Sequence, residues 1–154
     1  MSLRGSTTVK ERIFACLPYL LPLVEGLVFG SYLFQQVPAL YSAFAPLLRL
    51  SQLYTSIPFA SLIVFFALFL LVVRNESIAH FIRFNAMQAI LIDIVLFLCS
   101  FGLQIFGASF AAEILSNTVF IGLVAAVGYS VVQSALGRYA EVPVISEAVY
   151  MQVR

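Results

Sequence analysis

Four apolar stretches along the chain are each long enough, or almost long enough, to cross a lipid bilayer as an α-helix. They cover residues about 13–34, 58–73, 84–105 and 114–136. A membrane helix needs about 20 mainly apolar residues, because the hydrocarbon core is about 30 Å thick and each residue adds about 1.5 Å. The second stretch is short, and we expect it to start at Pro58, which is favoured as a first helical residue. Only 10% of the 154 residues are charged, so we expect an integral membrane protein.

The basic residues indicate on which side of the membrane each loop lies. Of the eight Lys and Arg residues, Arg49 alone falls in the first loop, and the other seven fall in the two tails and the second loop. Basic residues concentrate on the cytoplasmic side of membrane proteins. We therefore predict an all-α, polytopic fold with four transmembrane helices over residues 13–136 and both termini on the cytoplasmic or stromal side. A polar N-terminal tail (1–12) and a C-terminal tail (137–154) complete the chain.

The first loop, QQVPALYSAFAPLLRLSQLYTS, is long and apolar, and we expect Pro38 and Pro46 to break it. The polar residues after these prolines recur on one helical face: Arg49, Gln52 and Ser56. This pattern is typical of a short interfacial helix that lies in the membrane surface, here about residues 46–56. A re-entrant segment covered by other helices is the alternative.

A carboxylate, Asp93, lies well inside the third stretch. The residues within about 40° of it on an ideal helix are small or polar: Ala86, Ala89, Ser100, Gln104 and Gly107. We therefore expect Asp93 to face the bundle or water rather than lipid. An ionisable group at this depth costs about 3 kcal/mol on insertion scales. Two interpretations remain open, a functional group and a carboxyl that only ties helices together.

The first stretch contains a second acidic residue, Glu25, in the segment LPYLLPLVEGLVFG. Pro18 and Pro22 each remove a backbone donor, and the freed carbonyl groups need partners from other helices or water. A broken helix beside a glutamate is compatible with a transport path, and equally with a kink that serves packing. Whether Glu25 and Asp93 share a proton or face one cavity is open from the sequence.

Two further sets of residues are candidates for contacts between helices. The amides Asn85 and Gln88, at the start of the third stretch, are able to hydrogen-bond across helices. Small residues recur at every fourth position in the last stretch and predict a helix-packing seam within this chain or with another: Gly122, Ala126, Ser130 and Ser134.

Several function classes find no support in the sequence. The two cysteines have no metal-ligand spacing, there is one histidine, and no Gly-rich phosphate loop is present. We therefore expect no metal, no cofactor and no catalytic residues. A net charge of +1 leaves no basic field for nucleic acid.

Three segments resemble the Tic-twenty family, a small four-helix subunit of the translocon at the chloroplast inner envelope, with cyanobacterial relatives. These segments are RIFACLPYLLPLVEGLVFG (12–30), SIPFASLIVFFALFLLVVRN (56–75) and HFIRFNAMQAILIDI (80–94). The residues that match the family pattern are Phe84, Asn85, Met87, Gln88 and Asp93. The chain shows no recognisable transit peptide, and in this respect it resembles a cyanobacterial or plastid-encoded member more than a nuclear-encoded precursor.

The resemblance implies a role in protein translocation or insertion, within an oligomer or complex, and no enzymatic activity. The implied partners are other membrane-protein subunits, precursor polypeptides, further copies of the chain and the lipid bilayer. The implied location is a cyanobacterial membrane or a plastid inner envelope. Two other hypotheses remain, a structural or assembly subunit of a membrane complex and a small-solute or ion permease that uses Glu25 and Asp93.

Overall fold

The first helix of the bundle is long and locally irregular. The structure, a computed structural model, describes residues 7–153. Helical geometry is continuous over Val9–Gln36, a segment of 28 residues that is long and apolar enough to cross a membrane. It consists of α1 (Val9–Cys16), the 3₁₀ turn η1 (Leu17–Tyr19), α2 (Leu20–Glu25), the 3₁₀ turn η2 (Gly26–Gly30) and α3 (Ser31–Gln36).

The irregular turns of this helix occur at Pro18 and at its two glycines, whereas Pro22 lies within the regular helix α2. The 3₁₀ turn η1 contains Pro18, which lacks a backbone N–H, and η2 begins at Gly26 and ends at Gly30. A Cβ added at Gly26 would collide with the side chain of Leu123 on α7 (Phe110–Ala135). The glycine therefore lets the first helix and α7 approach closely.

The two longest helices form an antiparallel hairpin. The helix α6 (His80–Phe106) and α7 are joined by a short turn in which Gly107 has a φ of +60°. That angle lies in the region that favours glycine. Ser109 then caps α7 by accepting a hydrogen bond from the N–H of Ala112 at 3.2 Å. Both helices are long and apolar enough to cross a membrane.

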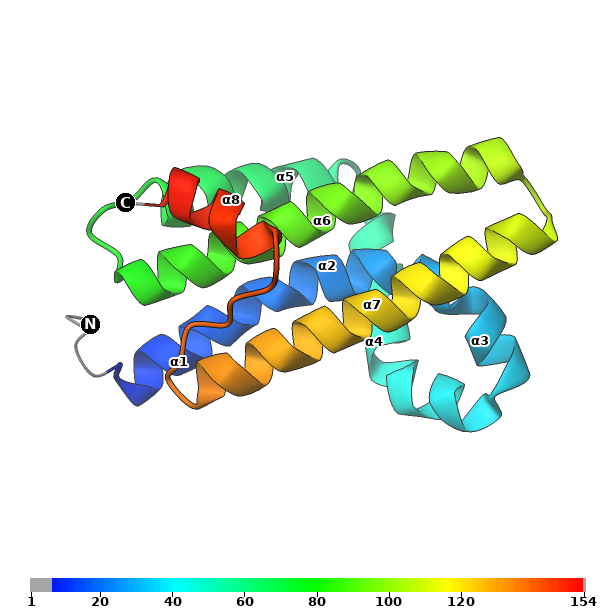
Figure 1. The fold of residues 1–154 in the computed structure, drawn as a ribbon, viewed down its shortest axis with the longest axis horizontal. Coiled ribbons are helices and arrows are strands. Elements are labelled where there is room, and N and C mark those ends of the chain that lie inside the picture. The colour runs from blue at the N-terminus through cyan, green and yellow to red at the C-terminus, as the bar shows by residue number, and fades with distance from the viewer. Residues whose placement is uncertain (1–6, 154) are drawn as a thin grey trace.

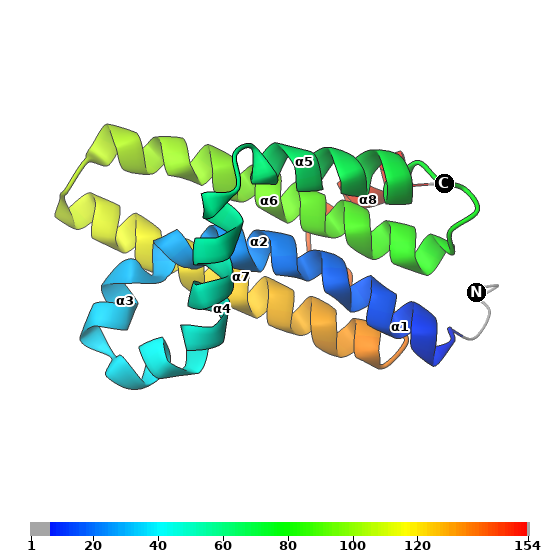
Figure 2. The same cartoon turned by 180° about the vertical axis from the view of Figure 1, so that it is seen from behind.

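The helix α4 (Pro38–Ser56) is longer than the predicted interfacial helix. Pro38 starts it instead of breaking it, because the first helical position needs no backbone donor. The helix also continues through Pro46, where we expected a break. Leu47 and Leu48, directly after this proline, pack against the main core cluster, and this contact offsets the lost hydrogen bond. Figure 2 shows α4 crossing in front of α2.

The second predicted span begins two residues later than expected. Pro58 lies in the turn before α5 (Ala60–Ala67), which continues into the π-helical η3 (Leu68–Val73). Residues 60–73 would measure about 21 Å as an α-helix, less than the hydrocarbon core. The helices before and after this turn differ in direction by 99°.

Residues 7–153 contain three helices able to span a membrane, or four if the bent pair α4 and α5–η3 counts as one span. This confirms an all-α membrane fold. The side on which the termini lie remains a prediction.

The predicted C-terminal tail contains a further helix, α8 (Ile145–Gln152). It packs on α6, with Val149 and Val153 almost fully buried. The ring of Tyr150 lies 5.0 Å from that of Phe84. The tail is therefore folded back onto the bundle, because its apolar residues cover the start of α6.

Candidate functional site

A buried polar network connects the first helix to α6 and α7. The hydroxyl of Tyr19 donates a hydrogen bond to Oδ1 of Asn85 at 2.7 Å, and Oγ of Ser134 donates to the same oxygen at 2.9 Å. Nδ2 of Asn85 donates to the carbonyl oxygen of Phe81 at 2.8 Å. Asn85 and Ser134 are fully buried and Tyr19 is 1% exposed. Every polar atom of the Asn85 amide thus has a partner, as buried amides require.

Gln88 extends this network towards the C-terminal segment. Its Nε2 lies 2.9 Å from Oη of Tyr19 and 2.9 Å from the carbonyl oxygen of Ala140, with Oγ of Ser130 farther away at 3.3 Å. Hydrogen bonds of this kind contribute about 0.5–1.5 kcal/mol each, and an unpaired buried partner costs about 1–3 kcal/mol. The two amides predicted from the sequence therefore hold three helices and the start of the C-terminal segment together.

A second polar site lies where α2, α4 and α6 meet, and it is only partly buried. The hydroxyl of Tyr54, near the end of α4, donates a hydrogen bond of 2.5 Å to Oε1 of Glu25, the last residue of α2. The carboxyl group of Asp93 on α6 interacts with that of Glu25. The two acidic residues that the sequence left unconnected thus form one site, which we call the carboxyl pair.

Asp93 is the more enclosed member of the carboxyl pair. Its side chain is 6% exposed, and its Oδ1 is buried with no hydrogen-bond partner among residues 7–153. This Oδ1 is therefore an acceptor that is able to take a hydrogen bond from water or from a passing polar group.

The predicted helical face around Asp93 is correct only on its N-terminal side. Ala86 and Ala89 are fully buried beside it, and Asp93 faces the bundle. Beyond Leu96 the helix loses most of its neighbours, so that Gln104 is exposed and Ser100 is only partly covered. The hydroxyl of Ser100 donates to the carbonyl oxygen of Phe97 on its own helix at 2.6 Å. Ser100 and Gln104 are therefore not part of the site.

The predicted seam on α7 is divided between the inside and the outside of the bundle. Ser130 and Ser134 are fully buried, Ala126 is half-buried, and Gly122 is exposed with open space where a Cβ would lie. Each step of four residues turns a helix by about 40° beyond a full turn, so the stripe rotates out of the interface. From Ser116 onwards, the residues that α7 buries follow alternating steps of four and three: Ser116, Phe120, Leu123, Val127, Ser130 and Ser134.

Sequence reasoning missed three residues that complete these sites. Tyr19 and Tyr54 lie in apolar segments, and their hydroxyl groups were the available signal, since a buried tyrosine usually finds a hydrogen-bond partner. Arg83 was counted only as a loop cation. It is 7% exposed, and its Nε donates to the carbonyl oxygen of Val73 at 2.9 Å, which caps the end of η3.

The described residues offer little to a metal ion. Within residues 7–153 there is no group of three or more His, Cys, Asp or Glu side chains placed to hold one. Chemically, the carboxyl pair is suited to exchange a proton or to accept hydrogen bonds.

Comparison with known proteins gives a consistent assignment. A family model described as "Chloroplast import apparatus Tic20-like" matches residues 8–149. A "Tic20 family protein" of Synechocystis is 47% identical over 161 residues, covering 100% of this chain and 99% of the relative. "Protein TIC 20-II, chloroplastic" of Arabidopsis thaliana is 35% identical, covering 96% of this chain and 74% of its own. "Tic20 family protein Ycf60" of Porphyra purpurea is also 35% identical, covering 97% and 78%.

Proposed function

Because the chain belongs to the Tic20 family, we propose that it is a membrane subunit that takes part in protein translocation or insertion as part of an oligomer or complex. It acts in a cyanobacterial membrane or a plastid inner envelope. The observation that supports this most is the family match over residues 8–149, which includes both polar sites.

The packing of the bundle supports a role that needs partner subunits. Its centre is filled by large side chains that are at most 1% exposed, among them Tyr19, Phe29 and Phe84. Residues 7–153 therefore enclose no passage through the bundle that would admit a polypeptide. A translocating segment passes instead along the outside of this subunit, between copies of the chain or between the chain and other subunits.

The carboxyl pair is the group of residues on which we expect this role to depend. Glu25 and Asp93 lie where α4 crosses the first helix, so a change at the pair alters how α4 is held. We place the function-dependent polar group at Asp93, whose Oδ1 has no partner among residues 7–153. The permease hypothesis uses the same two residues for a small solute or ion, and the assembly hypothesis needs neither in ionised form.

Site-specific photo-crosslinking in native membranes tests the proposal. A photoreactive phenylalanine analogue replaces one exposed residue at a time on different helices: Tyr41, Leu62, Phe97 and Ile121. A precursor polypeptide arrested during transit should cross-link at one or more of these positions. The matched control is the same precursor without its targeting segment, which should not cross-link.

The alternatives give different results in this experiment. A fixed set of membrane subunits at every position, with no arrested precursor, would reject the translocation role in favour of the assembly subunit. Transport of a small solute by vesicles that contain only this chain, without precursor cross-links, would reject it in favour of the permease.

A further inference from the structure

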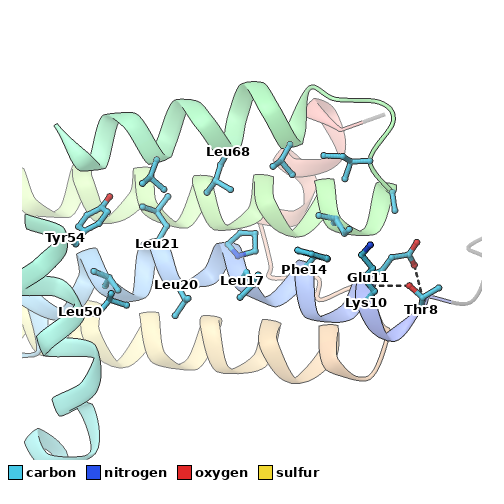
Figure 3. Close-up of a pocket in the computed structure, with 17 residues that line it drawn as sticks. Thr8, Lys10, Glu11, Phe14, Leu17, Leu20, Leu21, Leu50, Tyr54 and Leu68 are labelled. Carbon is cyan, nitrogen blue, oxygen red and sulfur yellow. Dashed lines mark hydrogen bonds between the residues drawn. The ribbon is translucent and has the colours of Figure 1, made fainter. Parts of the chain in front are cut away.

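An apolar groove lies on the outside of the bundle and reaches the polar site at Glu25 only through Tyr54 (Figure 3). It has a volume of about 790 Å³ and runs between α1–α2 on one wall and α5–η3 on the other. Phe14, Leu17 and Leu20 line the first wall, and Leu68 lines the second. Tyr54 on α4 lies at one end, and the first turn of α1 lies at the other. The groove is therefore apolar along its length and polar only at its ends.

We propose that this groove binds the acyl portion of one anionic glycerolipid, with the lipid's phosphate or other anionic head group at Lys10. An apolar groove that opens into a bilayer contacts hydrocarbon and not water, so an acyl chain is the ligand that the surroundings supply. This binding site is independent of the translocation role proposed above.

The length of the groove matches one membrane leaflet. From Lys10 to Val24, both of which line it, the helix rises roughly 21 Å at 1.5 Å per residue. Half of a bilayer, including its head-group region, is about 20–22 Å thick. A lipid with its head group at Lys10 therefore ends its chain near Tyr54, where α4 closes the groove.

The walls of the groove are irregular, because side chains from several helical segments line it, among them Phe14, Pro18, Leu50 and Val72. Flexible acyl chains are able to fill the irregular space between the two walls.

The charges at the open end favour an anionic head group. The Nζ of Lys10 lies 5.9 Å from the centre of the Phe14 ring, and Lys10 makes no ion pair within residues 7–153. Glu11 also lines this end. Its carboxylate is held at the N-terminus of α1, where Oε2 accepts from the N–H of Thr8 at 2.9 Å and Oγ1 of Thr8 accepts from the N–H of Glu11 at 3.2 Å. The positive end of the helix dipole there offsets part of the negative charge of Glu11. Lys10 therefore keeps its charge available at the mouth of the groove.

Tryptophan quenching tests the proposal directly, because the chain contains no tryptophan of its own. The full-length variants Leu68→Trp and Leu71→Trp each carry one tryptophan on the same helical segment. Leu68 lines the groove, whereas Leu71 is 67% exposed and does not. Each variant is reconstituted in phosphatidylcholine vesicles with a minor fraction of either phosphatidylglycerol or phosphatidylcholine that carries brominated acyl chains.

The proposal predicts a preference that depends on both position and charge. Brominated phosphatidylglycerol should quench Leu68→Trp about fivefold more effectively than brominated phosphatidylcholine does. One lysine near an anionic head group strengthens binding by about 1 kcal/mol, which corresponds to about fivefold in affinity. Leu71→Trp should show no such preference. Adding Lys10→Gln to Leu68→Trp should abolish the preference, and adding Arg138→Gln, which removes an exposed cation outside the groove, should leave it unchanged. Leu17→Trp repeats the measurement from the opposite wall.

Three results would overturn the proposal. Equal lipid preference at positions 68 and 71 would show that the groove has no lipid specificity. A preference that survives Lys10→Gln would remove the head-group site. Quenching at position 68 that falls as the protein-to-lipid ratio rises would assign the groove to a second copy of the chain.

Discussion

The hydroxyl of Tyr54 donates a hydrogen bond of 2.5 Å to the carboxyl group of Glu25, so the end of α4 is fixed to the end of α2. Asp93 on α6 interacts with the same carboxyl group. Three helices that are far apart in the sequence therefore meet at two acidic side chains. Since α4 buries none of its own residues, this contact is one of the specific attachments that hold it across the bundle.

Removing the hydroxyl of Tyr54 should loosen α4. A hydrogen bond of this kind contributes about 0.5–1.5 kcal/mol, so Tyr54→Phe should raise amide hydrogen exchange in α4 and lower the free energy of unfolding in detergent by that order. Tyr41→Phe is the matched control, because Tyr41 lies on the same helix and is 55% exposed. Equal exchange in α4 for the two variants would show that the hydroxyl contact does not hold the helix.

The buried amide network should behave as one cooperative unit. Gln88→Leu leaves the Ala140 carbonyl without this donor and should cost about 1–3 kcal/mol of unfolding free energy. Tyr19→Phe, which removes the donor to Asn85, should cost a similar amount. Because the two side chains share a hydrogen bond, the double variant should depart from additivity by about 0.5–3 kcal/mol. Strictly additive losses in denaturant unfolding would contradict the network.

The two ends of the predicted seam on α7 should respond oppositely to substitution. Ser130→Leu overfills a fully buried position and should destabilise the monomer by about 1–3 kcal/mol. Gly122→Ala meets open space and should be neutral or stabilise the helix by up to about 1 kcal/mol. Gly122→Leu adds a test of assembly on native gels. If it disrupts a complex while the unfolding free energy is unchanged, the outer stripe contacts another chain; an unchanged complex would assign it to lipid.

The topology predicted from the basic residues is testable with reporters. A reporter after Arg154 should lie on the cytoplasmic or stromal side, and one inserted at Gly107, in the turn between α6 and α7, should lie on the opposite side. The turn between α6 and α7 and the helix α8 lie towards opposite ends of the bundle (Figure 1), so accessible reporters should give opposite signals. The same signal from both would contradict a membrane-spanning α7, because α7 lies between the two positions in the chain.

The features predictable from the sequence are those that depend on helical periodicity within one segment. The burial of Asp93 followed from the small residues Ala86 and Ala89 on its face. The length of α4 was not predictable in this way. Pro46 removes one helical hydrogen bond, and the packing of the residues after it against the core, which offsets this loss, exists only in the folded chain. A local pattern carries no information about such long-range contacts.

The carboxyl pair illustrates the same limit for the site. Glu25 and Asp93 were each recognisable as ionisable residues in apolar segments, but their contact depends on how two separate helices cross. The contribution of Tyr54 depends further on how α4 crosses the first helix, which the sequence of α4 alone does not specify. The fourfold stripe on α7 drifts by about 40° at every step, so within this chain only Ser130 and Ser134 are fully buried, and a seam with another chain at Gly122 stays a prediction.

The role of Asp93 is tested most directly by replacing it in a host depleted of its own copy of the protein. Asp93→Asn keeps the size of the side chain and much of its hydrogen bonding but cannot ionise, whereas Asp93→Leu removes the polar group and adds bulk. Growth and the amount of protein in the membrane are measured together. Our account predicts that both variants accumulate and assemble normally but fail to support growth. Normal growth with Asp93→Asn at normal abundance, with Asp93→Leu reducing abundance, would contradict it and leave the carboxyl pair as a structural tie.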